Sequence, residues 1–432
     1  MLFHSSEQFT LYNGDSKQIL PTLAENSIDS IVCDPPYELG FMGKSWDSTG
    51  IANDVDLWKE VLRVLKPGGH LLAFSGSRTY HRMVVAIEDA GFEIRDQIMW
   101  VYGSGFPKSH NISKGIDKAA GAEREVIGRN PNSRENATKD NTLYESGTVG
   151  KTDYITKAAT ASAQQWQGWG TALKPAHEPI VLARKPFIGT VVNNVLTFGT
   201  GGINIDATRV GSDGGTFKAS KPEGISNGIY GEGINGAVDI GELNKGRWPA
   251  NFIHDGSDEV VELFPDNAGG GFGKRGALNG GATSWGFKGE MQEVGYGDSG
   301  SAARFFYCAK AGKRDRNEGL DIEQFPLKNY TTANKMGGES DTMLTGSGNP
   351  RDSRKQNHHP TVKPTDLMQY LCRLITPPSG TILDPFLGSG STGKAAMYEG
   401  FKFVGIELTD EYLPIAKARI EFSLAKLDEK LF

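Results

Sequence analysis

Short apolar segments alternate with helical stripes over about the first hundred residues. Ile28–Cys33 is a mostly apolar run of strand length that stops at Asp34. From Asp54 to Leu65 the apolar residues recur at helical spacing. Pro67-Gly68-Gly69 is expected to stop that helix, and His70–Phe74 is expected to form the next strand. Strand, helix and strand in this order predict βαβ units and a parallel sheet.

The same kind of patterning returns near the C-terminus, from about residue 355. Thr365 is expected to cap a helix that runs through Ile375. Thr381–Leu383 is predicted to be a strand that ends at Asp384, and a glycine-rich turn and a helix follow it. Phe401–Ile406 is predicted to be the next strand, and it ends at Glu407. A second set of βα units therefore lies far along the chain from the first.

The segment between these two sets has a different composition. Residues 108–175 are polar and rich in Asn, Ser, Thr, Lys and Gly, and a short strand is predicted at Pro179–Ala183. Of the 56 glycines, 26 lie between Gly199 and Gly300. No fixed period emerges, so a repeat architecture is rejected. Long loops of this kind are usually functional or disordered.

Composition limits the classes to which the 432-residue chain can belong. No apolar run approaches the ~18 residues that cross a bilayer, and no signal-peptide pattern begins the chain, which predicts a cytoplasmic protein. Cys33, Cys308 and Cys372 lie too far apart for a disulfide framework or a four-cysteine zinc site. The His358-His359 pair lacks a partner at ligand spacing, so no metal is predicted.

The glycine-rich turn that begins at Asp384 reads Asp-Pro-Phe-Leu-Gly-Ser-Gly-Ser-Thr-Gly-Lys. It matches most of a phosphate-binding P-loop, but Ala395 supplies no hydroxyl for Mg²⁺. A dinucleotide fold needs a second βαβ half, for which the about 40 remaining residues leave no room. The pattern favours an adenosine-containing ligand, with Glu407 accepting hydrogen bonds from ribose hydroxyls. A turn that serves only helix–strand packing is the alternative.

Asp34-Pro35-Pro36-Tyr37 follows the predicted strand Ile28–Cys33 directly. The two prolines remove two backbone donors, so the Asp34 carboxylate and the Pro35 carbonyl are both free to accept hydrogen bonds from one NH₂ group. Tyr37 offers a flat face on which a planar base can stack. The alternative interpretation is a common strand-ending turn.

Together these motifs resemble those of amino-group DNA methyltransferases. Asp34–Tyr37 resembles their catalytic motif, and Asp384–Ser391 resembles their S-adenosylmethionine loop. The catalytic motif comes first, as in the permuted β-class enzymes of the DPPY type, here of phage- or prophage-like character. Asn13-Gly14-Asp15 resembles the segment whose acid contacts the cofactor adenine, and His359–Pro364 resembles the segment that lines the methionine end.

The resemblance implies a fold class and a set of site residues. The fold is an α/β, Rossmann-like methyltransferase core, in which one seven-stranded sheet is assembled from both chain ends. The implied catalytic residues are Asp34, Pro35, Pro36 and Tyr37. The implied residues for binding S-adenosylmethionine are Asp15, Asp34, Lys363, Asp384, Pro385, Phe386, Gly388, Ser389, Gly390, Ser391, Thr392 and Glu407.

The resemblance also implies a division of the chain. The expected parts are a catalytic half of the core at 1–107, a flexible, DNA-contacting lid at 108–176, a returning core strand at 177–186, a loop-rich target-recognition insertion at 187–350 that is poorly ordered without DNA, and a cofactor-binding half at 351–432.

The implied activity is site-specific methylation of adenine N6 in double-stranded DNA, with the target base flipped out of the duplex. Cytosine N4 is the alternative, RNA or protein substrates are more remote, and a non-enzymatic relic would not keep both motifs. A homodimer and a role in restriction–modification are both compatible with the resemblance. The net charge of −6 requires local basic contacts to DNA. The expected DNA-contacting residues are Tyr102, which alternatively fills the core, and Lys310, Lys313, Arg314, Arg316, Arg351 and Arg354.

Overall fold

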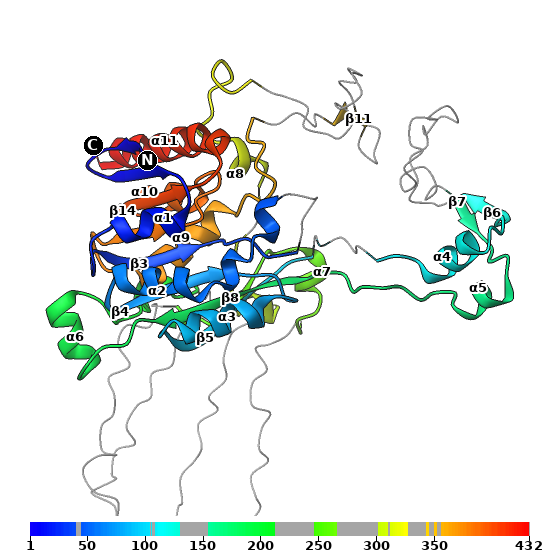
Figure 1. The fold of residues 1–432 in the computed structure, drawn as a ribbon, viewed down its shortest axis with the longest axis horizontal. Coiled ribbons are helices and arrows are strands. Elements are labelled where there is room, and N and C mark those ends of the chain that lie inside the picture. Colours follow the sequence, from blue (N-terminus) through cyan, green and yellow to red (C-terminus); the bar gives the residue numbers. More distant parts are fainter. Residues whose placement is uncertain are drawn as a thin grey trace, which may run out of the picture. The chain divides into compact units, whose positions relative to one another are not determined.

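The computed structural model describes residues 1–39, 45–103, 105, 109–129, 154–211, 246–265, 301–309, 312–326, 343–344, 350–351 and 356–431. The chain divides into two compact units (Figure 1). The first combines Met1–Gly103, His177–Phe325 and Asn357–Phe432, and the second combines Ser104–Ala176 and Pro326–Gln356. Each unit is described by itself.

The first unit is built on one ten-stranded sheet with the order β1-β2-β14-β13-β3-β4-β8-β5-β9-β10. The five neighbours from β2 to β4 run parallel, whereas β8 is antiparallel to both β4 and β5. The strands are β1 (Leu2–Ser5), β2 (Phe9–Asn13), β3 (Ile28–Cys33), β4 (Leu65–Phe74), β5 (Glu93–Val101), β8 (His177–Arg184), β9 (Phe252–His254), β10 (Tyr307–Cys308), β13 (Thr381–Asp384) and β14 (Lys402–Glu407).

The two ends of the chain meet in the middle of this sheet. Strand β13 pairs with β3 through Ile382 opposite Ser30 and Leu383 opposite Ile31. On its other side β13 pairs with β14, and β14 pairs with β2. The predicted assembly of one α/β sheet from both chain ends is therefore confirmed. The sheet is wider than the seven strands expected, because β1 extends one edge, and β9 and β10 extend the other.

Alternate residues of the central strands face two separate apolar layers, which explains their nearly continuous apolar sequences. Val32, Leu72 and Phe74 pack with the layer that contains α9 (Thr365–Ile375), α10 (Ser391–Tyr398) and α11 (Leu413–Leu431). Ile31 and Leu71 pack with the layer that contains α2 (Val55–Val64) and α3 (Tyr80–Asp89). Helices thus cover both faces of the sheet (Figure 1).

Two local predictions differ from the structure. Helix α2 ends at Val64 and β4 begins at Leu65, ahead of the Pro-Gly-Gly sequence, because buried Leu65 already pairs with Ile28 of β3. Thr365 is the first residue of α9 and makes no side-chain cap. Instead, the Thr365 amide donates to Asp315 Oδ1 at 2.9 Å, so a carboxylate distant in sequence satisfies this helix end.

Parts of the expected insertion at 187–350 belong to the first unit. Helix α6 (Val191–Phe198) contacts β4, and the Asn204 amide donates to the Leu374 carbonyl of α9 at 2.8 Å. Strands β9 and β10 join the sheet edge, and α7 (Asp258–Val261) and α8 (Lys313–Asn317) lie in the same unit. The compact unit therefore does not end at residue 187, because these pieces bury side chains against the core.

The second unit contains short helices and strands, most of them within residues 108–176, which were expected to form a lid. It holds α4 (Ile112–Ala119), β6 (Val126–Arg129) paired with β7 (Tyr154–Thr156), α5 (Ala161–Gln165), and β11 (Met343–Leu344) paired with β12 (Pro350–Arg351). The buried Asp117 carboxylate of α4 accepts hydrogen bonds from Arg124, Ala159 and Thr160 and so joins α4 to the start of α5. Across the described residues, no helix combines the length and apolar character needed to cross a membrane.

Candidate functional site

Four carboxylates follow neighbouring strands at one edge of the sheet. Because β2, β14, β13 and β3 are parallel, their C-terminal ends meet at this edge. Asp384 and Glu407 are the last residues of β13 and β14, Asp34 directly follows β3, and Asp15 follows β2 by two residues. The chain leaves β3 toward β4 and leaves β13 toward β14, so the strand order reverses between them. Open α/β sheets bind ligands at such a point.

Asp34 lies against a buried lysine from the other end of the chain. Lys363 Nζ is 2.6 Å from Asp34 Oδ2, and the Lys363 side chain is 8% exposed. The second carboxylate oxygen, Oδ1, is buried and has no hydrogen-bond partner among the described residues. An unpaired buried acceptor is costly in a folded protein, and it marks a place where a donor belongs.

Glu178 completes this cluster, and the sequence analysis did not identify it. Its Oε2 atom is 3.3 Å from Lys363 Nζ and accepts the Tyr37 hydroxyl hydrogen bond at 2.8 Å. Glu178 is the second residue of β8, and the antiparallel direction of β8 brings its beginning to the ends of the parallel strands. The only signal in the sequence was an acid at the start of an apolar run, because the run does not reveal the strand direction.

Burial and charge act in opposite directions on these groups. Burial raises the pKa of Asp34, whereas the ammonium of Lys363 opposes that rise. Burial also acts to lower the pKa of Lys363, but Asp34 and Glu178 outweigh it and raise the pKa above its usual value. Burial raises the pKa of Tyr37 well above its ordinary value, and the two carboxylates add to the effect. The cluster thus combines the acidic side chains of Asp34 and Glu178 with the Lys363 ammonium and the Tyr37 phenol.

Tyr102 borders the same cluster. Its ring is tilted against Trp100, with ring centroids 5.2 Å apart, and it packs on the apolar core. Burial raises the pKa of the Tyr102 hydroxyl, and the nearby Glu178 carboxylate raises it further. Tyr102 therefore contributes to the core and also faces the Glu178 side of the site.

The turn after β13 is held by backbone and side-chain hydrogen bonds to two of the carboxylates. Asp384 accepts from the Thr392 hydroxyl at 2.6 Å and from the Phe386 amide at 2.9 Å. Burial raises the pKa of Asp384 to about 7. Glu407 accepts from the amides of Gly388 and Thr409, each at 2.7 Å. Each Glu407 oxygen keeps a second lone pair that can accept from a hydroxyl group.

Two further contacts join the ends of β2 and β14 to this turn. The Gly14 amide donates to the Glu407 carbonyl at 2.9 Å, and the Ser16 hydroxyl donates to the Pro385 carbonyl. Asp15 caps the short helix α1 (Ser16–Ile19) by accepting from the Lys17 amide at 2.9 Å. These contacts bring Asp15, Glu407 and the turn together at the ends of the strands.

A family comparison agrees with the position of these motifs. The model of the N6_N4_Mtase family, described as DNA methylase, matches residues 28–195 and 288–418, which is more than half of the chain. The chain belongs to this DNA methylase family. The two matched segments contain Asp34, Glu178, Lys363, Asp384 and Glu407 of the site.

Individual relatives of this DNA methylase match over shorter stretches. Type II methyltransferase M2.LlaDCHI of Lactococcus lactis subsp. cremoris is 41% identical over 78 residues, which are 18% of this chain and 29% of the relative. Type II methyltransferase M2.DpnII of Streptococcus pneumoniae is 40% identical over 79 residues, which are 18% of this chain and 30% of the relative. The matches therefore span less than a third of each relative.

Solved structures with similar folds are more distant in sequence. The M1.HpyAVI–SAM complex is 15% identical with a TM-score of 0.38, and the alignment covers 95% of this chain and 98% of that one. The PvuII DNA methyltransferase (cytosine-N4-specific) is 13% identical with a TM-score of 0.42, and the alignment covers 99% and 93%.

The turn of the methylase rests on a network of buried polar groups. Arg419 donates to the Ser389 carbonyl and, at 3.0 Å, to the Ser389 hydroxyl. The side-chain amide of Asn357 donates to the same Ser389 hydroxyl at 3.0 Å. Arg316 donates to the carbonyls of Asn357 and His359 at 3.3 and 2.6 Å. Arg316 is thus turned into the protein, which differs from the phosphate contact expected of it.

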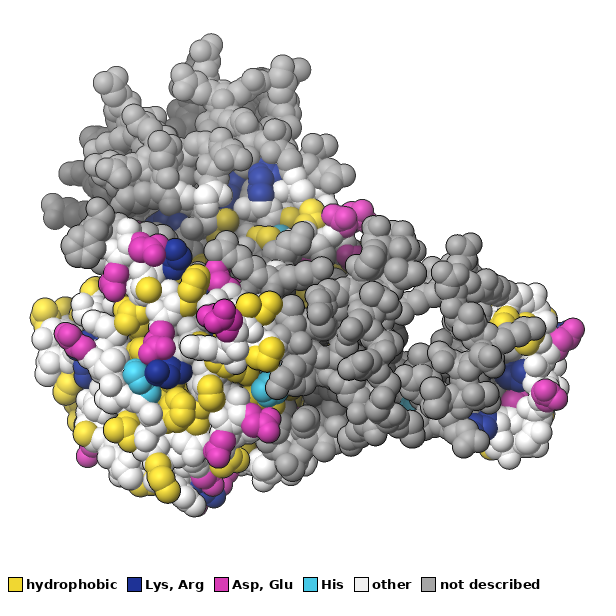
Figure 2. Space-filling model, turned by 90° about the horizontal axis from the view of Figure 1, so that it is seen from above, with side chains coloured by type: hydrophobic (Ala, Val, Ile, Leu, Met, Phe, Trp, Pro, Cys, Tyr) yellow, Lys and Arg dark blue, Asp and Glu magenta, His cyan; other side chains and the backbone are white. Residues whose placement is uncertain are grey.

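Lys310 and Arg354, together with the side chains of Lys313, Arg314 and Arg351, lie outside the described residues. On the face shown in Figure 2, Lys and Arg side chains are interspersed with Asp and Glu side chains, without a continuous basic band among the described residues.

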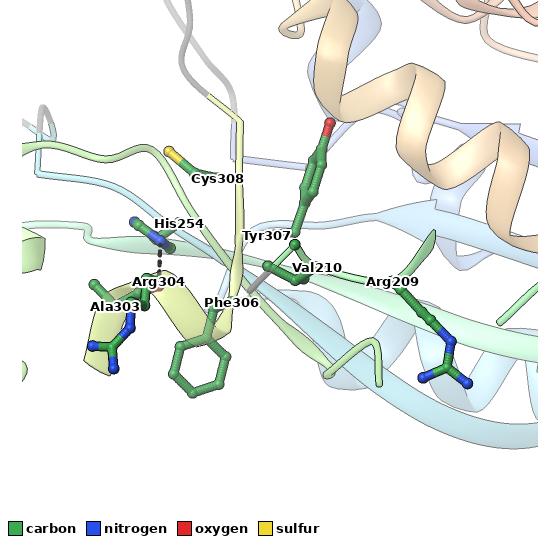
Figure 3. A pocket seen from close by; sticks show the side chains of 9 residues that line it. Arg209, Val210, His254, Ala303, Arg304, Phe306, Tyr307 and Cys308 are labelled. Carbon is green, nitrogen blue, oxygen red and sulfur yellow. Dashed lines mark hydrogen bonds between the residues drawn. The ribbon is translucent and has the colours of Figure 1, made fainter. Parts of the chain in front are cut away.

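A separate hollow of about 410 Å³ lies beside β9 and β10 of the methylase. Its lining includes His254, whose Nδ1 accepts from the Gly256 amide and whose Nε2 faces the Ala303 carbonyl at 3.2 Å (Figure 3). Both ring nitrogens are therefore occupied, and burial lowers the pKa of His254. None of the motif residues lines this hollow, so we do not assign the chemistry to it.

Proposed function

We propose that this DNA methylase transfers a methyl group from S-adenosylmethionine to N6 of adenine in double-stranded DNA, at a specific sequence. The observation that carries the proposal is the buried Oδ1 atom of Asp34, which has no hydrogen-bond partner in the part of the chain that the structure describes and lies at the end of a row of four carboxylates. A base amino group would supply the missing donor. The acids on the neighbouring strands suit a cationic, ribose-containing methyl donor.

The turn and the strand ends have the right chemistry to hold S-adenosylmethionine. Glu407 has lone pairs for the ribose hydroxyls, and Asp15 lies near it for the adenine end. Asp384 and the turn from Pro385 to Thr392 would hold the methionine end. The bound cofactor supplies an electrophilic methyl group on a sulfonium, whose positive charge the surrounding carboxylates favour.

The residues after β3 would orient the acceptor. A paired base is unreachable inside a duplex, so the target nucleotide must be flipped out. Asp34 Oδ1 and the Pro35 carbonyl then accept the two amino hydrogens, which directs the nitrogen lone pair toward the methyl group. Tyr37 stacks on the base, and Pro36 fixes the backbone between them. Attack of the amine would form the nitrogen–carbon bond as the sulfur–carbon bond breaks, the thioether S-adenosylhomocysteine would leave, and the methylated amine would give its extra proton to the Asp34 carboxylate. Positioning would provide much of the rate.

Lys363 and Glu178 would position these groups. Lys363 binds Asp34 Oδ2 and leaves Oδ1 for the amine. Glu178 binds both Lys363 and the Tyr37 hydroxyl, which fixes the tyrosine ring. Those parts of residues 187–350 that do not pack in the core of the first unit would contribute to recognition of the DNA sequence.

Asp34→Ala tests the proposal. We expect methyl transfer to fall at least about a thousandfold, because the amine loses its acceptor, whereas S-adenosylmethionine binding measured by calorimetry changes only a few-fold. Asp56→Ala, on the exposed face of α2, is the control and should keep both properties. Equal loss of transfer and cofactor binding in the Asp34 variant would contradict the assigned role.

The modified base identifies the substrate. Duplex DNA would be methylated with isotopically labelled S-adenosylmethionine, digested to nucleosides and analysed by mass spectrometry. We expect N6-methyladenine. Detection of N4-methylcytosine would instead identify cytosine as the target base and contradict the adenine assignment. Label in RNA or protein but not in DNA would overturn the proposal.

A further inference from the structure

The second unit presents two neighbouring tryptophans at its surface. Trp166 directly follows α5, and its ring meets that of Trp169 edge to face, with the ring centroids 5.0 Å apart. Trp166 is 39% exposed and Trp169 is 59% exposed, whereas the buried side chain of α5 is the small Ala163. Adjacent exposed aromatic rings are typical of a surface that a partner covers. We call Trp166 and Trp169 the tryptophan platform.

Hydrogen bonds hold the backbone of the tryptophan platform in place. The Trp169 carbonyl accepts from the Ile112 amide at 3.0 Å. The Ser109 hydroxyl accepts from the amide of Thr171 at 2.9 Å and from that of Ala172 at 3.3 Å. The rings are thus exposed on an ordered loop, which lowers the entropy lost when a partner binds.

The charge around the tryptophan platform favours an anionic partner. The segments that carry it and hold its backbone, residues 109–116 and 154–176, contain three lysines and neither Asp nor Glu. The sequence segments of the whole second unit contain 15 Lys and Arg against 10 Asp and Glu, whereas the rest of the chain contains 31 against 42. The net charge of −6 therefore conceals a second unit with a charge of +5.

Exposed indoles among lysines suit one kind of anion in particular. A nucleic acid supplies phosphates for the lysines and flat bases for the rings, and stacking of bases on aromatic side chains is a general mode of binding unpaired strands. An acidic protein surface would attract the lysines but would offer the indoles no flat partner. Bases stacked in a duplex present only their edges, so the base on the platform must have left its stack.

We propose that Trp169, supported by Trp166, stacks on an unstacked base of the substrate DNA. The inference rests on the proposed function, in which flipping of a nucleotide unstacks bases of the duplex. It adds a base contact in the second unit to the one assigned to Asp34 and Tyr37. Since every base has a flat face, this contact would hold opened DNA without selecting the recognition sequence.

Binding to two single strands of equal length and charge isolates the contribution of the bases. One is an oligothymidylate, whose bases lack the amino group that the Asp34 site would bind, and the other is an abasic strand with the same number of phosphates. Fluorescence anisotropy with the full chain should show about tenfold tighter binding to oligothymidylate. Because both strands release the same counterions, this ratio should not change between about 50 and about 200 mM salt.

Variants of the tryptophan platform assign this preference to one ring. Trp169→Ala should bind the two strands about equally, and Trp169→Phe should keep most of the preference because a flat face remains. Leu173→Ala, at an aliphatic residue 92% exposed in the same segment, is the matched control and should bind both strands as the wild type does. A wild type without a preference for bases, or a Trp169→Ala variant that keeps it, would overturn the proposal.

Methyl transfer to duplex DNA, measured in parallel, tests the proposed function separately. If DNA is methylated and Trp169→Ala keeps the preference for bases, only the stacking role fails. If the preference depends on Trp169 in an enzyme that methylates no DNA, the proposed function fails and the platform still binds bases. The Trp169 variants should unfold at the same urea concentration as the wild type, since the ring is largely exposed.

Discussion

At the scale of single residues, the site depends on carboxylates at the ends of strands and on the buried Lys363 that lies between Asp34 and Glu178. Asp34, Asp384 and Glu407 each follow an apolar run, and a parallel sheet brings such residues to one edge. Glu178 was missed because its strand is antiparallel, and its pairing with Lys363 joins residues far apart in sequence. Direction and long-range pairing are properties of the assembled sheet, and short-range patterns carry neither.

Variants of Glu178 separate its charge from its hydrogen bond. Glu178→Gln keeps an acceptor for the Tyr37 hydroxyl but removes the charge beside Lys363, and Glu178→Ala removes both. We expect kcat to fall about tenfold for Gln and about a hundredfold for Ala, equivalent to ~1.4 and ~2.8 kcal/mol. Steady-state kinetics on duplex DNA measures this. Glu93→Gln on β5 breaks the ion pair to Arg184, which lies at the far end of β8 from Glu178, and should leave kcat unchanged.

A double-mutant cycle identifies the path through which Glu178 acts. Tyr37→Phe removes the hydroxyl that donates to Glu178 and keeps the ring. If Glu178 positions that ring, the losses from Tyr37→Phe and Glu178→Ala are less than additive in the double variant. Full additivity would show that Glu178 does not act through Tyr37.

We predict that Asp384 links S-adenosylmethionine binding to pH. Because burial raises its pKa to about 7, this carboxyl gains and loses its proton near neutral pH in the free enzyme. A bound cation would lower the pKa, so binding near pH 7 should release protons. Affinity for S-adenosylmethionine should weaken as the pH falls below 7 and level off above about 8, since the carboxyl must lose its proton to attract the cation.

Calorimetry in two buffers of different ionisation enthalpy measures this proton release. Asp384→Asn should abolish the buffer dependence, and Asp89→Asn, at an exposed site on α3, should retain it. A buffer-independent binding enthalpy for the wild type at pH 7 would rule out the linkage.

At the scale of elements, hydrophobic periodicity predicted most of the core helices and strands. The strand Ile28–Cys33 has the predicted bounds, and the helix that was expected to follow a Thr365 cap ends at Ile375 as predicted but begins at Thr365 itself. Periodicity failed at helix ends, where the satisfying group can come from anywhere in the chain. The amide of Thr365 is bound by Asp315, 50 residues earlier, which no local capping signal could reveal.

The turn between β13 and α10 depends on a glycine that has two constraints. Gly388 has φ +54°, and an added Cβ would lie 2.9 Å from His359 Nε2. Burial lowers the pKa of His359 to about 3, and its Nδ1 faces the Thr361 carbonyl at 2.8 Å, so the neutral ring is held in place. A side chain at 388 would have to displace this ring.

Gly388→Ala and Gly50→Ala distinguish backbone strain from the clash. Gly50 has φ +78° and open space around its Cβ position. We expect Gly50→Ala to lower the free energy of unfolding by about 1 kcal/mol, and Gly388→Ala to lower it by ~2–4 kcal/mol and to weaken S-adenosylmethionine binding. Urea denaturation and calorimetry provide both values. Equal destabilisation by the two substitutions would mean that the His359 contact is unimportant.

At the scale of the whole first unit, a short segment of the central region supports the turn of the site. Asp315 binds α9, Arg316 binds the segment before Lys363, and the Asp315 carbonyl accepts from Arg419 of α11 at 2.7 Å. From composition, the segment that contains Asp315 and Arg316 was expected to lie outside the core, because the stretch that precedes it is rich in glycine. Its function as a support was not predictable, because every partner lies more than 40 residues away in sequence.

The buried ion pair between Glu318 and Lys394 allows the strength of this support to be measured. Lys394 Nζ is 2.6 Å from Glu318 Oε2, and the side chain of Lys394 is 0% exposed. Glu318→Ala leaves a buried cation without its carboxylate, which should cost ~3–5 kcal/mol in the free energy of unfolding. Adding Lys394→Met removes that cation and should restore most of the loss, even though the ion pair is gone. Urea denaturation of both variants measures the difference, with Glu323→Ala as the exposed control. If the double variant is no more stable than Glu318→Ala, the loss of stability comes from lost contacts of the segment that contains Glu318 and not from the unpaired ammonium of Lys394.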